Sequence, residues 1–175
     1  GKILFKKEIE ILENDTVGTI HDSLMEIGAR LVIETVDALA AGEYNAITQS
    51  ELVNGSEIKH APKIFKEDCK INWSKDVESV RNLIRGLSPY PTAWSVLVHK
   101  ESGKEIITKL FFATQVDDDS QELPGTTKTD GKTFLKVSCG NGWLQITDLQ
   151  LAGKKRMKAD DFLRGFQQIE EYRFM

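Results

Sequence analysis

Residues 84–94, which read Ile-Arg-Gly-Leu-Ser-Pro-Tyr-Pro-Thr-Ala-Trp, constrain the fold of this 175-residue chain more than any other stretch. Pro89 and Pro91 each hold φ near about −65° and push the residue before them into extended geometry. Gly86 can take the left-handed conformation that ends a helix. Helical periods dominate before this corner, and short apolar runs separated by glycine turns follow it. We therefore predict that a helix ends here and that β-structure begins here.

The first 42 residues show the pattern of one strand followed by one long helix. Apolar and charged residues alternate over 3–12, which predicts a strand. Asn14, Asp15 and Thr16 are candidate N-caps, and Gly42 is a candidate stop. The apolar residues between them have helical spacing: Val17, Ile20, Leu24, Ile27, Leu31, Val32, Val36 and Leu39. Such a pair cannot bury its own apolar faces, so we expect the helix either to form a homodimer or to pack on the barrel predicted for the later part of the chain.

A connection without periodicity leads to a second helix. Residues 43–59 lack an apolar period and contain the turn signal Asn54-Gly55, so we predict a linker. Ser74 is a good N-cap for a helix that we expect to end at Arg85.

The residues after the corner predict a small barrel. Tyr90 and Trp94 are expected to bury apolar area beside the turn. Asp130-Gly131 and residues 140–142 are hairpin turn signals between runs of β-branched and aromatic residues. Short strands with tight turns favour an antiparallel barrel of the oligonucleotide/oligosaccharide-binding (OB) kind, within an α+β fold, over a sandwich. The strands are expected at 94–99, 105–116, 125–128, 133–138 and 143–149.

Few residues carry the pattern of a catalytic or metal site. Cys69 and Cys139 are far apart and form no CxxC motif, which argues against a zinc site or a disulfide framework and favours a reduced, cytoplasmic compartment. His21, His60 and His99 have no metal-ligand spacing. The apolar runs are shorter than the ~18 residues of a membrane span, and no signal peptide opens the chain.

The net charge of −4 conceals an asymmetry along the chain. Between residues 8 and 57 the only basic side chain is Arg30, whereas basic residues outnumber acidic ones from Lys59 onward. This pattern excludes nucleic-acid contact over the whole surface and leaves room for a local positive face. The candidate nucleic-acid-binding residues form one loop cluster and one linker cluster: Lys154, Lys155, Arg156 and Lys158, and Lys59, Lys63 and Lys66. We expect both clusters to lie on one face and to contact phosphates.

Four blocks in order, residues 61–68, 71–73, 84–94 and 152–157, resemble the C-terminal half of methionyl-tRNA formyltransferases, and residues 1–4 resemble the segment that closes the catalytic domain. The resemblance implies the end of an α/β Rossmann-like formyltransferase domain over 1–42, a linker over 43–73 and a barrel domain over 74–175. It implies transfer of a formyl group from 10-formyltetrahydrofolate to methionyl-initiator tRNA by the full enzyme.

The resemblance also limits what the chain can do alone. The family's catalytic Asn, His and Asp have no counterpart in the matched blocks, so we expect no catalytic residue, no cofactor site and no formyl transfer from this chain by itself.

Two alternatives stay open at this point. One is the appendage of a formyltransferase that acts on a nucleotide-linked amino sugar. The other is a non-catalytic barrel that binds single strands or a protein, which would require exposed aromatic residues for base stacking. Phe111, Phe112, Phe134 and Trp143 are candidates by type, although core packing explains them equally well.

Overall fold

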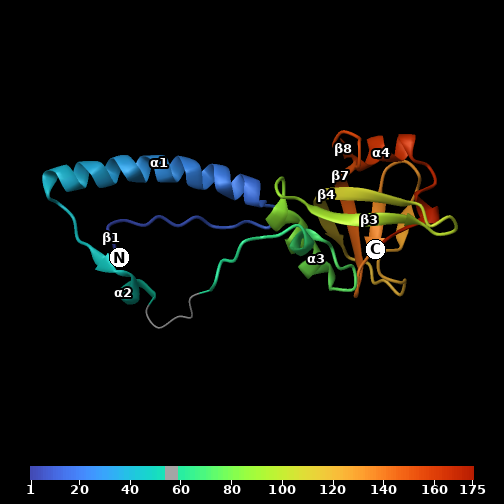
Figure 1. Cartoon of the computed structure of the whole chain (residues 1–175), viewed down its shortest axis with the longest axis horizontal. Coiled ribbons are helices and arrows are strands. Elements are labelled where there is room, and N and C mark those ends of the chain that lie inside the picture. Colours follow the sequence, from blue (N-terminus) through green and yellow to red (C-terminus); the bar gives the residue numbers. More distant parts are fainter. Residues whose placement is uncertain (54–58) are drawn as a thin grey trace. The chain divides into compact units, whose positions relative to one another are not determined.

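The structure is a computed structural model that describes residues 1–53 and 59–175, and the chain divides into two compact units, Gly1–Lys63 and Ile64–Met175 (Figure 1). The predicted Asn54-Gly55 turn lies outside the described residues. The domain boundaries predicted at residues 42 and 73 refer to a longer enzyme and stay a prediction. No helix within the described ranges is long and apolar enough to cross a membrane.

The first unit is built around one long helix. Strand β1 (Lys2–Ile3) pairs antiparallel with β2 (Ile47–Thr48), and α1 (Val17–Ala41) and α2 (Gln49–Val53) complete the unit. Thr16 caps α1 through a reciprocal pair of hydrogen bonds with Thr19, and Gly42 ends it in the left-handed conformation, which confirms the predicted helix and its stop.

One prediction for the first unit is wrong. The strand expected over 3–12 is only Lys2–Ile3, and the residues after it have no regular structure, because only two strand residues find a pairing partner. The stretch predicted as a linker, 43–59, contains β2 and α2 in its described part. The side chain of Glu51 accepts hydrogen bonds from the backbone and the hydroxyl of Thr48, which supports the start of α2.

The second unit is an antiparallel sheet that is nearly closed into a barrel (Figure 1). Its strand order is β5 (Thr127–Thr129), β6 (Leu135–Ser138), β7 (Trp143–Leu151), β4 (Glu105–Val116), β3 (Ala93–His99) and β9 (Tyr172–Phe174), and the short β8 (Met157–Lys158) pairs with β7. Helices α3 (Val77–Leu87) and α4 (Ala159–Gly165) and the short 3₁₀ turns η1 (Glu67–Cys69) and η2 (Ile169–Glu171) complete it. The predicted α+β fold with an OB-like barrel is confirmed, and the third, fourth and fifth predicted strands are displaced by two residues or fewer at each end.

The sheet closes where β5 meets β9. Thr126 and Arg173 form an isolated antiparallel bridge, and the backbone N–H of Phe174 donates to the Gly125 oxygen at 2.9 Å. Gly125 has φ +87°, and a Cβ there would lie 2.0 Å from the Phe174 oxygen. Only glycine therefore permits this close approach of the two strand ends.

The core lies between α3 and the inner face of the barrel. Val77, Val80, Ile84 and Leu87 are buried at helical spacing on α3. They pack in one cluster with inward residues of the strands, including Leu97, Leu110, Leu144 and Leu149. The indole N–H of Trp73 donates to Ser95 at 2.9 Å inside this cluster, which joins the segment before α3 to β3.

Helix α3 and the corner that follows it at residues 84–94 differ from the prediction in three details. The helix begins after Asp76, whose carboxylate accepts from the Ser79 N–H, and not after Ser74. It continues past Gly86 to Leu87, because Leu87 gains burial in the core; Gly86 does not adopt positive φ. Tyr90 is 84% exposed and buries little, since it lies at the tip of the turn, whereas Trp94 is half-buried.

Candidate nucleic-acid interface

A row of polar and aromatic side chains crosses the outer face of the barrel sheet. Trp94 on β3 is directly opposite Lys109 on β4, and Lys109 is directly opposite Gln150 on β7. Opposite residues of antiparallel strands project from the same face, with Cβ atoms about 5 Å apart. This register places an exposed lysine between a half-buried indole and a carboxamide.

Two further lysines lie at the Trp94 end of the row. The indole N–H of Trp94 donates to the backbone oxygen of Lys66 at 2.8 Å. The ammonium nitrogens of Lys66 and Lys70 lie 5.6 and 5.7 Å from the ring centroid, within the range of a cation–π contact. The indole therefore holds both cations beside the outer face of the sheet.

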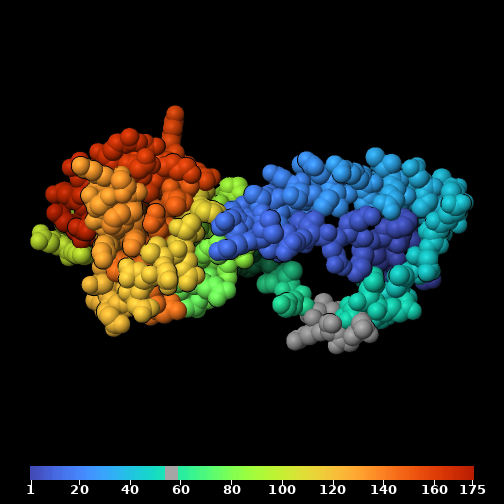
Figure 2. All heavy atoms as spheres, turned by 180° about the vertical axis from the view of Figure 1, so that it is seen from behind, coloured from blue at the N-terminus to red at the C-terminus, as the bar shows by residue number. Residues whose placement is uncertain are grey.

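The Gln150 end of the row anchors the loop between β7 and β8. The Gln150 side chain donates to the backbone oxygen of Lys154 at 2.8 Å, and the Lys154 N–H donates to Leu151 at 3.0 Å. Gly153, at φ +74°, makes the turn between them. A narrow orange-red projection rises from the second unit in this part of the chain (Figure 2). Lys154 and Lys155 are exposed in this loop.

Asp148 engages the other two cations of the loop. Its Oδ1 accepts from Arg156 at 3.1 and 3.3 Å, and its Oδ2 accepts from Lys158 at 2.8 Å. The Arg156 guanidinium also lies 4.4 Å from the centroid of the Phe111 ring. The loop thus carries two cations balanced in part by a buried carboxylate and two that project from it.

The structure brings together some of the predicted tRNA-binding residues and leaves others apart. Lys66 belongs to the second unit, together with Lys154, Lys155, Arg156 and Lys158. Lys59 and Lys63 belong to the first unit, so their place on a common face stays a prediction. Sequence reasoning missed Lys109, because its role depends on the pairing of β3, β4 and β7. The outward position of a lysine in an alternating strand was the only signal for it.

The aromatic residues proposed for base stacking are not exposed platforms. Phe111 and Trp143 are buried, and Phe112 and Phe134 are half-buried. The exposed rings of the second unit are instead Phe65 and Tyr90, at 57% and 84%.

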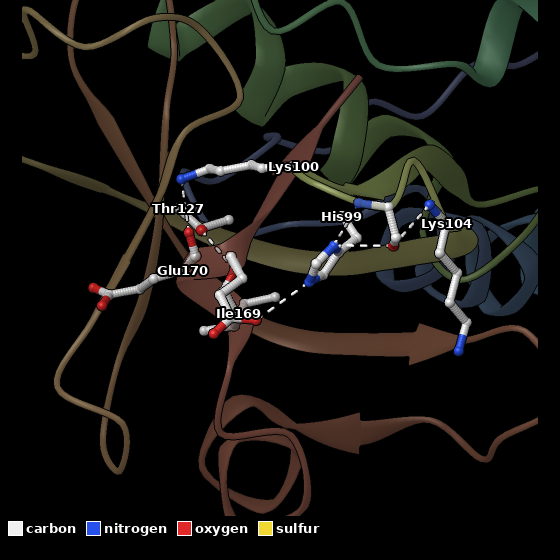
Figure 3. A network of polar contacts seen from close by, with 8 residues as sticks. His99, Lys100, Lys104, Thr127, Ile169 and Glu170 are labelled. Carbon is white, nitrogen blue, oxygen red and sulfur yellow. Dashed lines mark hydrogen bonds and ion pairs between the residues drawn. The ribbon is translucent and has the colours of Figure 1, made fainter.

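His99 joins the β3–β4 hairpin to the C-terminal segment (Figure 3). Its Nδ1 accepts from the Ser102 N–H at 3.1 Å, and its Nε2 lies 3.2 Å from a Glu171 carboxylate oxygen. The Ser102 hydroxyl lies 3.0 Å from the same Nδ1, so the three groups resemble a catalytic triad. Because the backbone N–H already occupies the Nδ1 lone pair, the imidazole is a poor base for that hydroxyl, and the network serves to hold the hairpin.

The two cysteine thiols lack the low pKa of a reactive nucleophile. Burial raises the pKa of the Cys139 thiol to about 12 and also raises the pKa of Cys69, so both thiols stay protonated near neutral pH. Within residues 1–53 and 59–175, no group of His, Cys, Asp and Glu could hold a metal ion.

A small antiparallel barrel with a basic row on one sheet face and a projecting basic loop is typical of a nucleic-acid-binding module. Residues 63–167 match the family model described as the formyl transferase C-terminal domain, and the chain belongs to this family. The resemblance found in the sequence is confirmed. The matched range begins at the boundary between the two units.

Three curated relatives share one name. A methionyl-tRNA formyltransferase of Bacteroides fragilis is 44% identical over 173 residues, covering 99% of this chain and 53% of the relative. One from Parabacteroides distasonis is also 44% identical, covering 98% and 53%, and one from Flavobacterium johnsoniae is 38% identical, covering 94% and 50%. The chain spans about half the length of the curated relatives it matches.

Solved structures support the fold alone. A crystal structure of a HypX variant from Aquifex aeolicus superposes with a TM-score of 0.63 at 19% identity, covering 91% of this chain and 28% of HypX. HypX from the same organism in complex with tetrahydrofolic acid superposes with a TM-score of 0.55 at 20% identity, covering 78% and 22%.

Proposed function

We propose that this chain is the tRNA-binding C-terminal part of a methionyl-tRNA formyltransferase, an enzyme of translation initiation in the cytoplasm. The observation that carries the proposal is the 44% identity to enzymes of that name over 99% of the chain. The whole enzyme would transfer a formyl group from 10-formyltetrahydrofolate to the amino group of methionyl-initiator tRNA. This chain would hold the acceptor side of the tRNA and present its 3′ end to a catalytic domain.

The arrangement of charge supports this role. Lys66, Lys70, Lys109 and Lys154 are associated with one row across one sheet face, and Lys155 extends it along the loop. Phosphates of a nucleic-acid backbone follow one another at regular spacing, so a row of cations suits them better than one compact substrate. A nucleotide-linked amino sugar carries too few phosphates to engage such a row.

The first prediction tests the loop through its salt dependence. Replacing Lys154 and Lys155 with Ala should weaken binding of initiator tRNA and reduce the magnitude of the log–log salt slope by about 2, since each neutralised phosphate contributes about 0.9. Arg156 is not replaced, because its contact with Asp148 holds the loop. Replacing Arg156 would change the stability of the loop as well as its affinity for tRNA. Fluorescence anisotropy at several salt concentrations measures both quantities.

The matched control replaces Lys104 and Lys132, two exposed lysines at hairpin turns, with Ala. It removes the same charge and should change the slope much less. Equal affinities and slopes for wild type and the Lys154/Lys155 variant would move the binding face elsewhere. In the whole enzyme, the loop variant should impair use of tRNA while the folate site stays intact.

A further inference from the structure

The row of Trp94, Lys109 and Gln150, with the lysines beside it, is called the lysine row below. An exposed groove opens at its Trp94 end. Its volume is about 440 Å³, within the range of pockets that hold small molecules. Phe65, Trp94 and Ile107 line it, and Tyr90 borders it from the corner between α3 and β3. All of these residues belong to the second unit.

The groove is apolar and positively charged at the same time. Phe65 and Tyr90 are mostly exposed, and Ile107 is 47% exposed. Lys66 and Lys109 also line the groove, and no carboxylate of the described residues does. Aromatic rings beside ammonium groups match a nucleotide, because the base has a π-face that stacks and the phosphate carries negative charge.

We propose that this groove binds an unpaired nucleotide of the nucleic acid whose phosphates lie along the lysine row. The proposal rests on the proposed function. Phe65 and Tyr90 stack on the base, and Lys66 and Lys109 contact the adjoining phosphates. Because Trp94 and Lys109 belong to both the groove and the row, a strand that leaves a duplex on the sheet face enters the groove without a break in phosphate contacts.

The geometry favours a single-stranded partner over a protein. Stacking on aromatic rings requires bases that are not already stacked in a duplex, and such contacts are tolerant of sequence. A docked apolar peptide would leave the Lys66 and Lys109 ammonium groups without a charged partner from the ligand, whereas a phosphodiester supplies one at each nucleotide. The occupant is therefore a short unpaired stretch, not a base-paired one.

The test compares two RNA probes with the purified 175-residue chain. One probe is a hairpin with a short single-stranded 3′ extension, and the other is the same hairpin with a blunt end. Tyr90→Ala and Phe65→Ala should each bind the extended hairpin about 10-fold more weakly, toward the low end of what a stacked base contributes. Affinity for the blunt hairpin and both salt slopes should not change, because no charge is removed.

Three variants serve as controls. Tyr90→Phe keeps the ring and should restore affinity for the extended hairpin. Tyr44→Ala removes a half-exposed tyrosine of the first unit and should bind both probes like wild type. Trp73 and Trp143 are buried, so quenching of tryptophan fluorescence by the extended probe should come from Trp94. This quenching should not occur in the Trp94→Phe variant.

The outcomes separate this proposal from the proposed function. If tRNA and both hairpins bind through the basic loop while the ring variants lose nothing, the groove proposal is overturned and the proposed function stands. If neither tRNA nor either hairpin binds, both fail. If the ring variants alter sedimentation of the protein and leave RNA affinity unchanged, the groove is a protein contact and the nucleotide proposal is wrong.

Discussion

At the residue scale, Asp148 is the side chain that fixes the basic loop between β7 and β8. Its side chain lies in the sheet at 6% exposure and bonds to Arg156 and Lys158. Burial raises the pKa of this carboxyl, but the hydrogen bond from Lys158 and the charge and hydrogen bond of Arg156 together outweigh it, so its pKa lies below the usual value. The loop therefore depends on an ionised carboxylate.

Asp148→Asn should lower the free energy of unfolding of the barrel by about 2 kcal/mol at neutral pH, because two cations lose their charged partner. Since the pKa of Asp148 is lower in the folded than in the unfolded chain, its contribution is present above about pH 4 and is lost as pH falls through the folded-state pKa. The difference between variant and wild type should therefore shrink in acid. Urea denaturation followed by tryptophan fluorescence measures it, since all three tryptophans belong to the second unit.

Asp119→Asn is the matched control, because Asp119 is an exposed acid of the loop after β4. It should have little effect on stability at any pH. A stability difference for Asp148→Asn that stays constant into acid would show that the carboxylate charge does not hold the loop.

At the scale of elements, α1 carries many apolar residues that the described structure leaves largely uncovered. None of its side chains is buried in the described structure. Ile20, Ile27 and Leu31 are half-buried, whereas Val32 and Val36 are 63% and 58% exposed. The predicted apolar stripe thus exists, but only part of it is covered.

We predict that the isolated chain forms a homodimer through α1, because each exposed aliphatic side chain forfeits about 1.5–3 kcal/mol of burial. Sedimentation should give a mass that rises with concentration. Val32→Lys with Val36→Lys should shift the chain to monomer, whereas Ser23→Lys, on the opposite side of the helix, should not. A monomer at every concentration, with α1 protected from hydrogen exchange, would contradict this prediction.

At the scale of the whole molecule, the chain combines a family domain with a smaller unit that precedes it. The sheet face and the groove belong to the second unit, and Lys59 and Lys63 belong to the first. Among the described residues no group of His, Cys, Asp and Glu could hold a metal ion, and burial raises the pKa of both cysteine thiols.

We predict that the purified 175-residue chain does not transfer a formyl group to methionyl-tRNA from 10-formyltetrahydrofolate. The reason is that the family's catalytic Asn, His and Asp have no counterpart in the matched blocks; in addition, the thiols are protonated and the lone pair of His99 Nδ1 is occupied. A discontinuous assay of formylated tRNA, with a full-length relative as the positive control, checks this. Turnover clearly above the uncatalysed rate would refute it.

The sequence by itself determined the elements whose causes are local. The helix from Val17 ends at Gly42, and hairpins form at Asp130-Gly131 and Gly140–Gly142, because capping groups, turn residues and periodicity act within a few residues. The same local patterns were sufficient to predict the barrel, and the four family blocks were sufficient to predict the family.

Only the tertiary structure decided what depends on contacts between distant residues. Strand register places Trp94, Lys109 and Gln150 in one row, although 56 positions of sequence separate the first from the last. In the folded chain Arg156 forms an ion pair with Asp148, and Tyr90 is exposed at the corner. No local pattern encodes these outcomes, because pairing, burial and charge neutralisation are settled only when separate strands meet.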